Sequence, residues 1–191
     1  ADAFLVKFNT NGTRQWATYY GGTNYDRGQS CTTDPSGNVY LAGQTQSTSA
    51  IASGGHQNSI GGSADAFLVK FNSSGTRQWA TYYGGTAYEY GQSCSTDPSG
   101  NVYLTGQTES TSVIASGGHQ NSIGGSADAF LVKFNTNGTR QWATYYGGTS
   151  YDVGYSCTID PSGNVYLAGY TTSTSAIASG GHDNTHGGSY D

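Results

Sequence analysis

The chain has 191 residues, a formal net charge of −5 and 10% charged side chains, with 30 Gly, 16 Tyr, three Trp and no Met. Its seven basic residues are scattered over the sequence, which argues against a nucleic-acid partner, because phosphates need clustered Lys and Arg. No apolar run approaches 18 residues, so no transmembrane helix is predicted. The sequence starts at Ala1 without a visible signal peptide, which indicates a processed product or a piece of a longer protein.

The sequence repeats itself every 63 residues. Unit one is 1–63, unit two is 64–126, and 127–191 contains unit three plus the start of a fourth at Tyr190. Units one and two differ at only nine positions, which indicates recent duplication or deliberate design. Repetition at a period of this length predicts a modular fold, in which each unit contributes the same set of elements.

Each unit contains four predicted strands, here given for unit one. The run 2–9 (DAFLVKFN) alternates Phe4, Val6 and Phe8 on one face, and 13–22 (TRQWATYYGG) is aromatic. The run 28–34 (GQSCTTD) is small and polar, and 38–45 (NVYLAGQT) alternates again. The turns TNG and PSG separate the strands of each pair, and a Ser/Gly-rich loop, 46–64, leads to the next unit.

Four antiparallel strands per repeat, without helical periodicity, are typical of a β-propeller blade, so the predicted fold class is all-β. The small side chains of 28–34 suit the crowded position beside the propeller axis, and the aromatic strand suits the outer edge. The predicted order from the axis outward is therefore GQSCTTD, NVYLAGQT, DAFLVKFN and TRQWATYYGG.

The motifs DAFLVKFN, W-T-YYGG, D-G-S and D-SGNVYL-G-T together resemble the SBBP-type β-propeller repeat of secreted bacterial proteins. The similarity covers all three units nearly from end to end. It implies a propeller fold and an extracellular or cell-surface location, and it implies no catalytic residues. One departure is that a closed propeller needs at least about four blades, whereas this chain has three units.

The two ends of the sequence are complementary in the predicted blade order. The strands 2–9 and 13–22 lack inner partners, and the strands 154–160 and 164–171 lack outer ones. An open sheet edge invites pairing with another chain. We therefore predict a homodimer that closes a ring of six blades, with two alternatives: a longer parent propeller or an open array.

Differences between the copies concentrate on one predicted face, which carries the connection 22–27 and the loop 46–64, while the DPSGN turn never changes. Drift on a tolerant surface and diversification of a binding site both explain this pattern. If a ligand binds, tyrosine rings suit sugars and other polyols, and carboxylates accept hydrogen bonds from their hydroxyls. The candidate ligand-binding residues are Asp26, Arg27, Glu89, Tyr90, Asp152, Tyr155, Tyr170, His56, His119 and His182.

Each of these candidates also has a structural alternative. The acidic residues could cap turns, and the histidines, one per SGGH motif, could anchor the long loop. Asp34, Asp97 and Asp160 are predicted to accept backbone N–H bonds within the DPSGN turn. The three Trp residues, Trp16, Trp79 and Trp142, are predicted to pack between blades, with stacking on a sugar as the alternative.

The sequence contains no pattern for catalysis, metal binding or a cofactor. A nucleophile elbow, a phosphate loop and a Cys-x-x-Cys motif are missing, and His182 and His186 lack an evident third metal ligand. The cysteines Cys31, Cys94 and Cys157 recur once per unit and are predicted to be small buried hydrophobic side chains. We therefore expect a non-enzymatic protein with neither a cofactor nor a metal.

The predicted function is an extracellular binding or adhesion module of lectin-like type, with shallow sites repeated on the long-loop face. Such repeated sites gain strength from avidity. The alternative is a structural repeat scaffold or spacer without a ligand. The expected partners are a second copy or the rest of a longer chain, together with a glycan or a cell-surface ligand, and nucleic acid and membrane spans are not expected.

Overall fold

The computed structural model describes residues 1–188, so the predicted start of a fourth unit at Tyr190 lies outside the described residues. Strands account for all its regular structure, and no helix in 1–188 is long and apolar enough to cross a membrane. The strands are β1 (Ala3–Phe8), β2 (Arg14–Tyr20), β3 (Asp26–Thr33), β4 (Val39–Thr45), β5 (Asp65–Phe71), β6 (Arg77–Tyr83), β7 (Glu89–Thr96), β8 (Val102–Thr108), β9 (Asp128–Phe134), β10 (Arg140–Tyr146), β11 (Asp152–Ile159) and β12 (Val165–Thr171).

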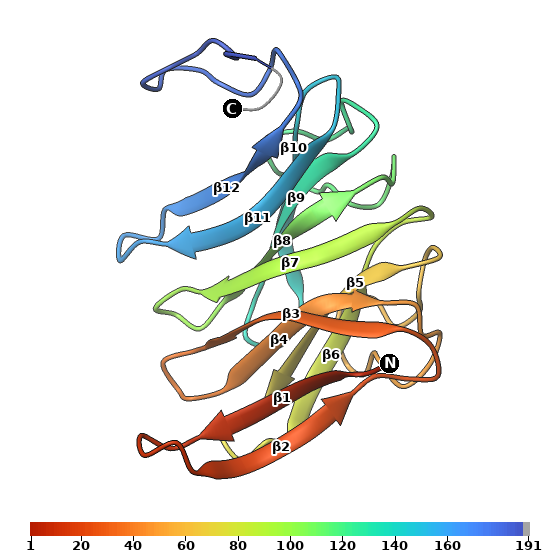
Figure 1. The fold of residues 1–191 in the computed structure, drawn as a ribbon, viewed down its shortest axis with the longest axis vertical. Helices are drawn as coiled ribbons and strands as arrows, with labels where there is room; N and C mark the ends of the chain where they lie inside the picture. The colour runs from red at the N-terminus through yellow and green to blue at the C-terminus, as the bar shows by residue number, and fades with distance from the viewer. Residues whose placement is uncertain (189–191) are drawn as a thin grey trace.

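The strands form two complete antiparallel blades and two half-blades (Figure 1). The complete blades have the orders β3-β4-β5-β6 and β7-β8-β9-β10, while β1-β2 and β11-β12 form two-stranded sheets. This confirms the predicted all-β propeller class and the predicted strand order. Each blade starts in one sequence unit and finishes in the next, so the pair β1-β2 lacks inner strands and β11-β12 lacks outer strands among the described residues.

The DPSGN turns close the β3-β4 and β7-β8 hairpins as predicted. The Oδ1 atom of Asp34 accepts hydrogen bonds from the backbone N–H groups of Ser36 at 2.9 Å and Asn38 at 3.0 Å. Gly37 has a φ of 78°, a left-handed conformation that costs a glycine little. The side chain of Asp34 therefore satisfies backbone groups that the tight turn would otherwise leave unpaired.

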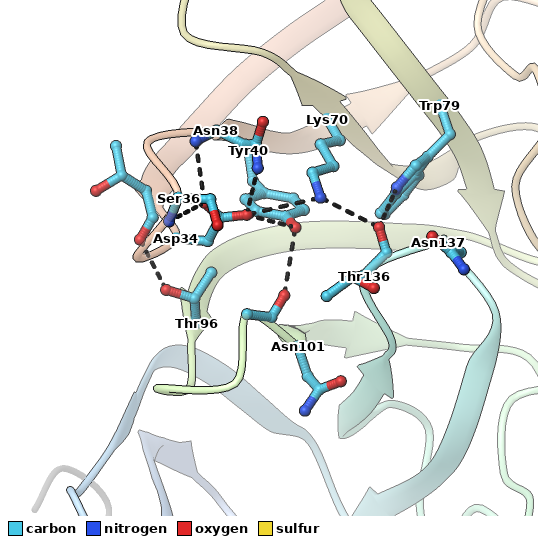
Figure 2. A network of polar contacts seen from close by, with 12 residues as sticks. Asp34, Ser36, Asn38, Tyr40, Lys70, Trp79, Thr96, Asn101, Thr136 and Asn137 are labelled. Carbon is cyan, nitrogen blue, oxygen red and sulfur yellow. Dashed lines mark hydrogen bonds and ion pairs between the residues drawn. The ribbon is translucent and has the colours of Figure 1, made fainter.

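Hydrogen bonds connect neighbouring blades at the face that carries these turns, which we call the turn face (Figure 2). Lys70 Nζ lies 3.6 Å from Asp34 Oδ2 in its own blade and donates to the carbonyl of Thr136, 3.2 Å away in the next blade. Trp79 Nε1 donates to the same carbonyl at 3.0 Å. Trp79 is 6% exposed, so the prediction that this residue packs between blades is confirmed.

The long loop takes a path that the sequence did not predict. Part of loop 46–64 lies beside β6, where Ser53 exchanges two backbone hydrogen bonds with Ala80, and Gln57 accepts one from Tyr82. The loop therefore adds a short outer edge to the blade and covers backbone groups of β6 that would otherwise stay exposed. The corresponding contacts of β10 are made with Ser116 and Gln120.

The cysteines follow the prediction of buried side chains in two of three cases. Cys94 and Cys157 are buried, whereas Cys31 is exposed, and all three are free thiols. Burial raises the pKa of Cys94 to about 12 and that of Cys157 to about 11, so both thiols are poor nucleophiles. The prediction fails at Cys31 because, within the described residues, β3 has an inner-strand neighbour on one side only.

Candidate functional site

The three candidate carboxylates lie beneath the long-loop face and point into the protein. Asp26 is 2% exposed, Glu89 0% and Asp152 2%. Asp26 accepts hydrogen bonds from Thr45 Oγ1, from Ser47 Oγ at 2.8 Å and from the N–H of Gly22 at 2.8 Å. These contacts match the turn-capping alternative, because the oxygens are occupied by protein donors and are shielded from solvent.

A second buried acid accompanies two of the three carboxylates, Asp65 beside Glu89 and Asp128 beside Asp152, whereas the acid beside Asp26 is the exposed Asp2. A Cβ built on Gly84 would lie 2.4 Å from Glu89 Oε2 and 2.5 Å from Asp65 Cγ, so only glycine fits between the two acids. Burial, together with the nearby charge of Glu89, raises the pKa of Asp65 to about 6. Burial likewise raises the pKa of Glu89. These acids are therefore pH-sensitive parts of the scaffold.

The same face carries an aromatic group between the complete blade β7-β8-β9-β10 and the neighbouring strand β11. We call Tyr88, Tyr90, Gln107, Glu109 and Tyr151 the tyrosine cluster. The rings of Tyr88 and Tyr90 stack with an interplanar angle of 7° and a centroid separation of 6.3 Å. Tyr151 donates its hydroxyl hydrogen to Gln107 Oε1 at 2.9 Å, which joins side chains from adjacent blades.

The tyrosine cluster combines apolar faces with hydrogen-bonding groups at the surface. Tyr88 is 40% exposed and Tyr151 is 37% exposed, while Tyr90 is half-buried between them. Burial raises the pKa of the Tyr90 hydroxyl, and the charge of Glu109 raises it further. The Tyr90 phenol therefore stays neutral at physiological pH and can donate a hydrogen bond, while the exposed Glu109 can accept one.

A β-bulge recurs in the innermost strand of each blade. The pairing of β3 with β4 shifts between Gly28 and Ser30, and the equivalent shift in β11 brackets Tyr155. A bulge leaves one residue unpaired and redirects its side chain. The bulged position holds Gln29, Gln92 and Tyr155 in the three copies, so one of the variable positions is a site of irregular backbone. Tyr155 is 56% exposed on this strand.

The other candidates near the inner strands lie at the two ends of the protein. Arg27 is exposed, pairs across the ladder with Gln44, and lines a cleft of about 440 Å³ between β1 and β3. Tyr170 is half-buried, pairs with Val153, and lines a cavity of about 220 Å³ beside β12. The structure thus distributes the predicted site over three separate places.

The candidate histidines lie apart from the tyrosine cluster, on the long loops. His56, His119 and His182 are all exposed. His56 belongs to the loop segment that borders the outermost strand β6, and it lines a hollow of about 610 Å³ together with Arg140 and Val113. Although the residue as a whole is exposed, partial desolvation of its ring, which lies 6.2 Å from the ring of Phe134, and the charge of Arg140 lower the pKa of His56. A whole blade width therefore separates this hollow from the inner strands.

Comparison of the three sequence units with one another missed two members of the tyrosine cluster. Tyr88 and Tyr151, with Tyr25, occupy the same position in every unit, so a search for variable positions passed over them. A usable signal was present, because an aromatic residue directly before a buried acid recurs once per unit in a Gly-rich connection. Among residues 1–188, no group of three or more His, Cys, Asp or Glu side chains is placed to hold a metal ion.

Comparison with known proteins places these features in context. The sequence profile of the SBBP beta-propeller repeat matches residues 15–49, 78–112 and 141–175, which together make up more than half of the chain. An uncharacterized WD repeat-containing protein of Acanthamoeba polyphaga mimivirus is 25% identical over 189 residues. That alignment covers 85% of this chain but 14% of the viral protein, so the chain spans about one seventh of this relative.

Proposed function

The chain belongs to the SBBP family of β-propeller repeat proteins, and from this premise we propose that it is a non-enzymatic interaction module of lectin-like type. The observation that carries the proposal is the tyrosine cluster, in which two stacked rings, a third tyrosine and the carboxylate of Glu109 share one surface, with Tyr151 bonded to the buried amide of Gln107. The proposed ligand is a glycan on a cell surface or an extracellular polymer, in the extracellular setting that the family resemblance implies.

The chemistry of a sugar matches this surface. One face of a pyranose ring presents C–H groups that pack on aromatic rings, and its edge presents hydroxyls that donate and accept hydrogen bonds. Tyr88 and Tyr90 supply the aromatic faces, and Glu109 accepts from hydroxyl donors. Asp26, Glu89 and Asp152 have no part in the proposed contact, because their oxygens are buried and already bonded.

The proposed sites are shallow and differ from blade to blade. The second residue of the innermost strand is Arg27 in the first copy, Tyr90 in the second and Val153 in the third. We therefore expect the site that contains Tyr90 to bind best, with single-site dissociation constants of roughly millimolar order. Repetition around a propeller raises the overall strength by about 10²–10⁴ when the ligand is itself repetitive.

A passive structural repeat is the second candidate function. It is favoured by the near-identity of the units, which differ at nine of 63 positions between units one and two. The WD repeat-containing relative supports an interaction role over catalysis only by analogy of fold. The two candidates make opposite predictions about ligand binding, so one experiment separates them.

A glycan array with fluorescently labelled protein tests the proposal. We expect wild-type protein to bind a subset of glycans, and the double variant Tyr88→Ala/Tyr90→Ala to lose at least about tenfold in signal, because stacking on aromatic rings is removed. Tyr90→Phe keeps the ring and should retain most of the binding. Gln78→Ala, an exposed change on the outer strand β6, serves as the matched control. Wild-type protein that binds no glycan would contradict the lectin-like proposal and favour the spacer.

A further inference from the structure

We propose that a second copy of this chain pairs its β1 with β12, and that two such seams close a ring of six blades. The inference rests on packing within the chain and is independent of the proposed function. Two copies of the same junction already exist inside the chain, between β4 and β5 and between β8 and β9, and they serve as templates for the seam.

The internal junctions fix the register of the proposed seam. The β4–β5 ladder runs from Val39 opposite Phe71 to Thr45 opposite Asp65, and β8–β9 repeats this register 63 residues later. The same offset places Val165 opposite Phe8 of the second copy and Thr171 opposite its Asp2. The edges of β1 and β12, which have no partner strand among residues 1–188, thus have complementary sequences for seven consecutive pairs.

A phenylalanine and a glycine form a matched pair at each internal junction. Phe67 and Phe130 are both 0% exposed, and each ring carbon Cε1 lies 2.9 Å from where a Cβ would stand on Gly43 or Gly106. Their equivalent, Phe4, is 68% exposed. No phenylalanine covers the matching glycine of β12, Gly169, within the described residues.

The cavity of about 220 Å³ beside β12 is where Phe4 of a second copy would lie. It is lined by Gly169, Tyr146 and Ile177. At the internal junctions the tyrosines equivalent to Tyr146 pack on the buried phenylalanine, with ring centroids 5.1 Å apart for Tyr20 and Phe67. Tyr146 already donates its hydroxyl hydrogen to the Ile177 carbonyl and so is held in place to receive the ring.

The opposite end offers a matching cleft. The hollow of about 440 Å³ between β1 and β3 is lined by apolar residues that include Leu5, Leu41 and the exposed Cys31. Inside the chain the space next to β7 is filled by β3, where the N–H of Cys94 donates to Ser30 Oγ at 3.3 Å. By the same offset, β11 of the second copy fills this cleft and buries Cys31.

Charge pairing continues across the proposed seam. Lys70 pairs with Asp34 and Lys133 with Asp97, at 3.6 and 3.4 Å. Lys7 is the remaining lysine of this series, and among residues 1–188 no carboxylate pairs with it. Asp160 is the acid equivalent to Asp34 and Asp97, and its carboxyl group is exposed. The seam brings Lys7 of the second copy to Asp160.

The assembled ring would also complete a third aromatic group. Tyr151 extends the tyrosine cluster from the neighbouring blade, and Tyr25 of the second copy would occupy the equivalent place beside Val153 and Tyr170. A role of this third group in ligand binding rests on the proposed function, whereas the seam itself does not depend on whether a ligand binds there.

Sedimentation velocity or light scattering at micromolar concentration tests the assembly. We expect a discrete species at twice the chain mass of 19.9 kDa. Phe4→Ala should weaken association by at least ~100-fold, and Phe4→Asp should give a monomer, because the ring leaves an apolar cavity empty or a charge enters it. Gln15→Asp carries the same added charge at a position that is exposed in all three copies, and it should remain dimeric. A wild-type monomer, an open polymer or a dimeric Phe4→Asp variant would each overturn the proposal.

Disulfide cross-linking tests the register independently. In a Cys31→Ser background, Ala3→Cys combined with Tyr170→Cys joins two residues that the seam places opposite each other. We expect this variant to run as a covalent dimer without reductant, whereas Lys7→Cys with Tyr170→Cys, four residues out of register, should not cross-link. Equal cross-linking of both pairs, or a ladder of larger species, would contradict the closed two-copy ring. Circular dichroism of each variant confirms that the strands have formed.

Discussion

The turn face and the long-loop face are made by the same repeat but are bonded in different ways. On the turn face, Lys70 and Trp79 reach across to one carbonyl of the next blade, and Asp34 holds its own turn closed. On the long-loop face the acids are buried beneath the surface, and several side chains near them, such as Arg27, Tyr90 and Val153, differ from copy to copy.

This contrast explains which positions repeat without change. A substitution in a turn disturbs two blades at once, because the turn supplies acceptors and packing surface to its neighbour. A substitution at an exposed tip such as Arg27 or Tyr90 leaves the ladder hydrogen bonds intact, because only the side chain changes. The turn face is therefore the structural half of the repeat, and the other face is free to vary.

Two glycines at the same turn position separate backbone strain from the contact between blades. Gly138 and Gly12 have φ values of 80° and 76°, but only at Gly138 would a Cβ meet a ring, 2.8 Å from Trp79 Cδ2. Both alanine variants lose about 1 kcal/mol of stability through backbone strain. Gly138→Ala should lose about 1–3 kcal/mol more, because the ring must move.

Chemical denaturation of the two glycine variants in the Phe4→Asp background, where no second copy can place Trp142 against Gly12, gives the comparison directly. The difference between their free energies of unfolding isolates the contact between blades, since the backbone conformation is matched. Equal losses at Gly12 and Gly138 would mean that the turn face does not connect neighbouring blades as described.

The buried acids predict a pH dependence for the long-loop face. The pKa of Asp65 is about 6 in the folded protein and 3.8 ordinarily, so folding favours the protonated acid. This stabilisation is fully present below about pH 3.8 and is lost as pH rises through about 6. We expect the melting temperature to fall by about 3 °C between pH 5 and pH 7, equivalent to roughly 1 kcal/mol.

Glu89→Gln provides the control for the pH effect. It removes the charge that faces Asp65, so the pKa of Asp65 should fall and the dependence on pH should shrink. The difference between wild type and variant also cancels the opposing contribution of His56, whose lowered pKa favours unfolding in acid. An unchanged pH dependence in the variant would show that the two acids are not coupled.

The elements of the fold were predictable because local patterns determine them. Alternation in DAFLVKFN, the small residues of GQSCTTD and the turn residues of DPSGN gave the strands and their order across a blade. The contacts of Lys70 and Trp79 were not predictable in the same way. Both reach Thr136 in the next blade, which is 66 positions from Lys70 and 57 from Trp79.

The candidate site was harder to predict than the fold. The burial of Asp26, Glu89 and Asp152 depends on hydroxyl groups supplied by the neighbouring strand and loop, which sequence alternation does not specify. His56 lies on the outer edge because its loop pairs with β6, a path that a Ser/Gly-rich sequence does not encode locally. Comparison of the copies did identify Tyr90, because its variation is visible without any structure.

Thermal unfolding of Tyr103→Ala and Tyr90→Ala tests most directly whether the two faces have separate roles. Both changes remove a tyrosine from the same blade. Tyr103 is 2% exposed, bonds to Asp97 Oδ2 at 3.2 Å and packs edge-on against Trp142, whereas Tyr90 belongs to the exposed tyrosine cluster. We expect Tyr103→Ala to lose about 3–5 kcal/mol and roughly 10 °C in melting temperature. Tyr90→Ala should lose less than about 1 kcal/mol. Equal losses in the two variants would contradict the division into a structural face and a variable one.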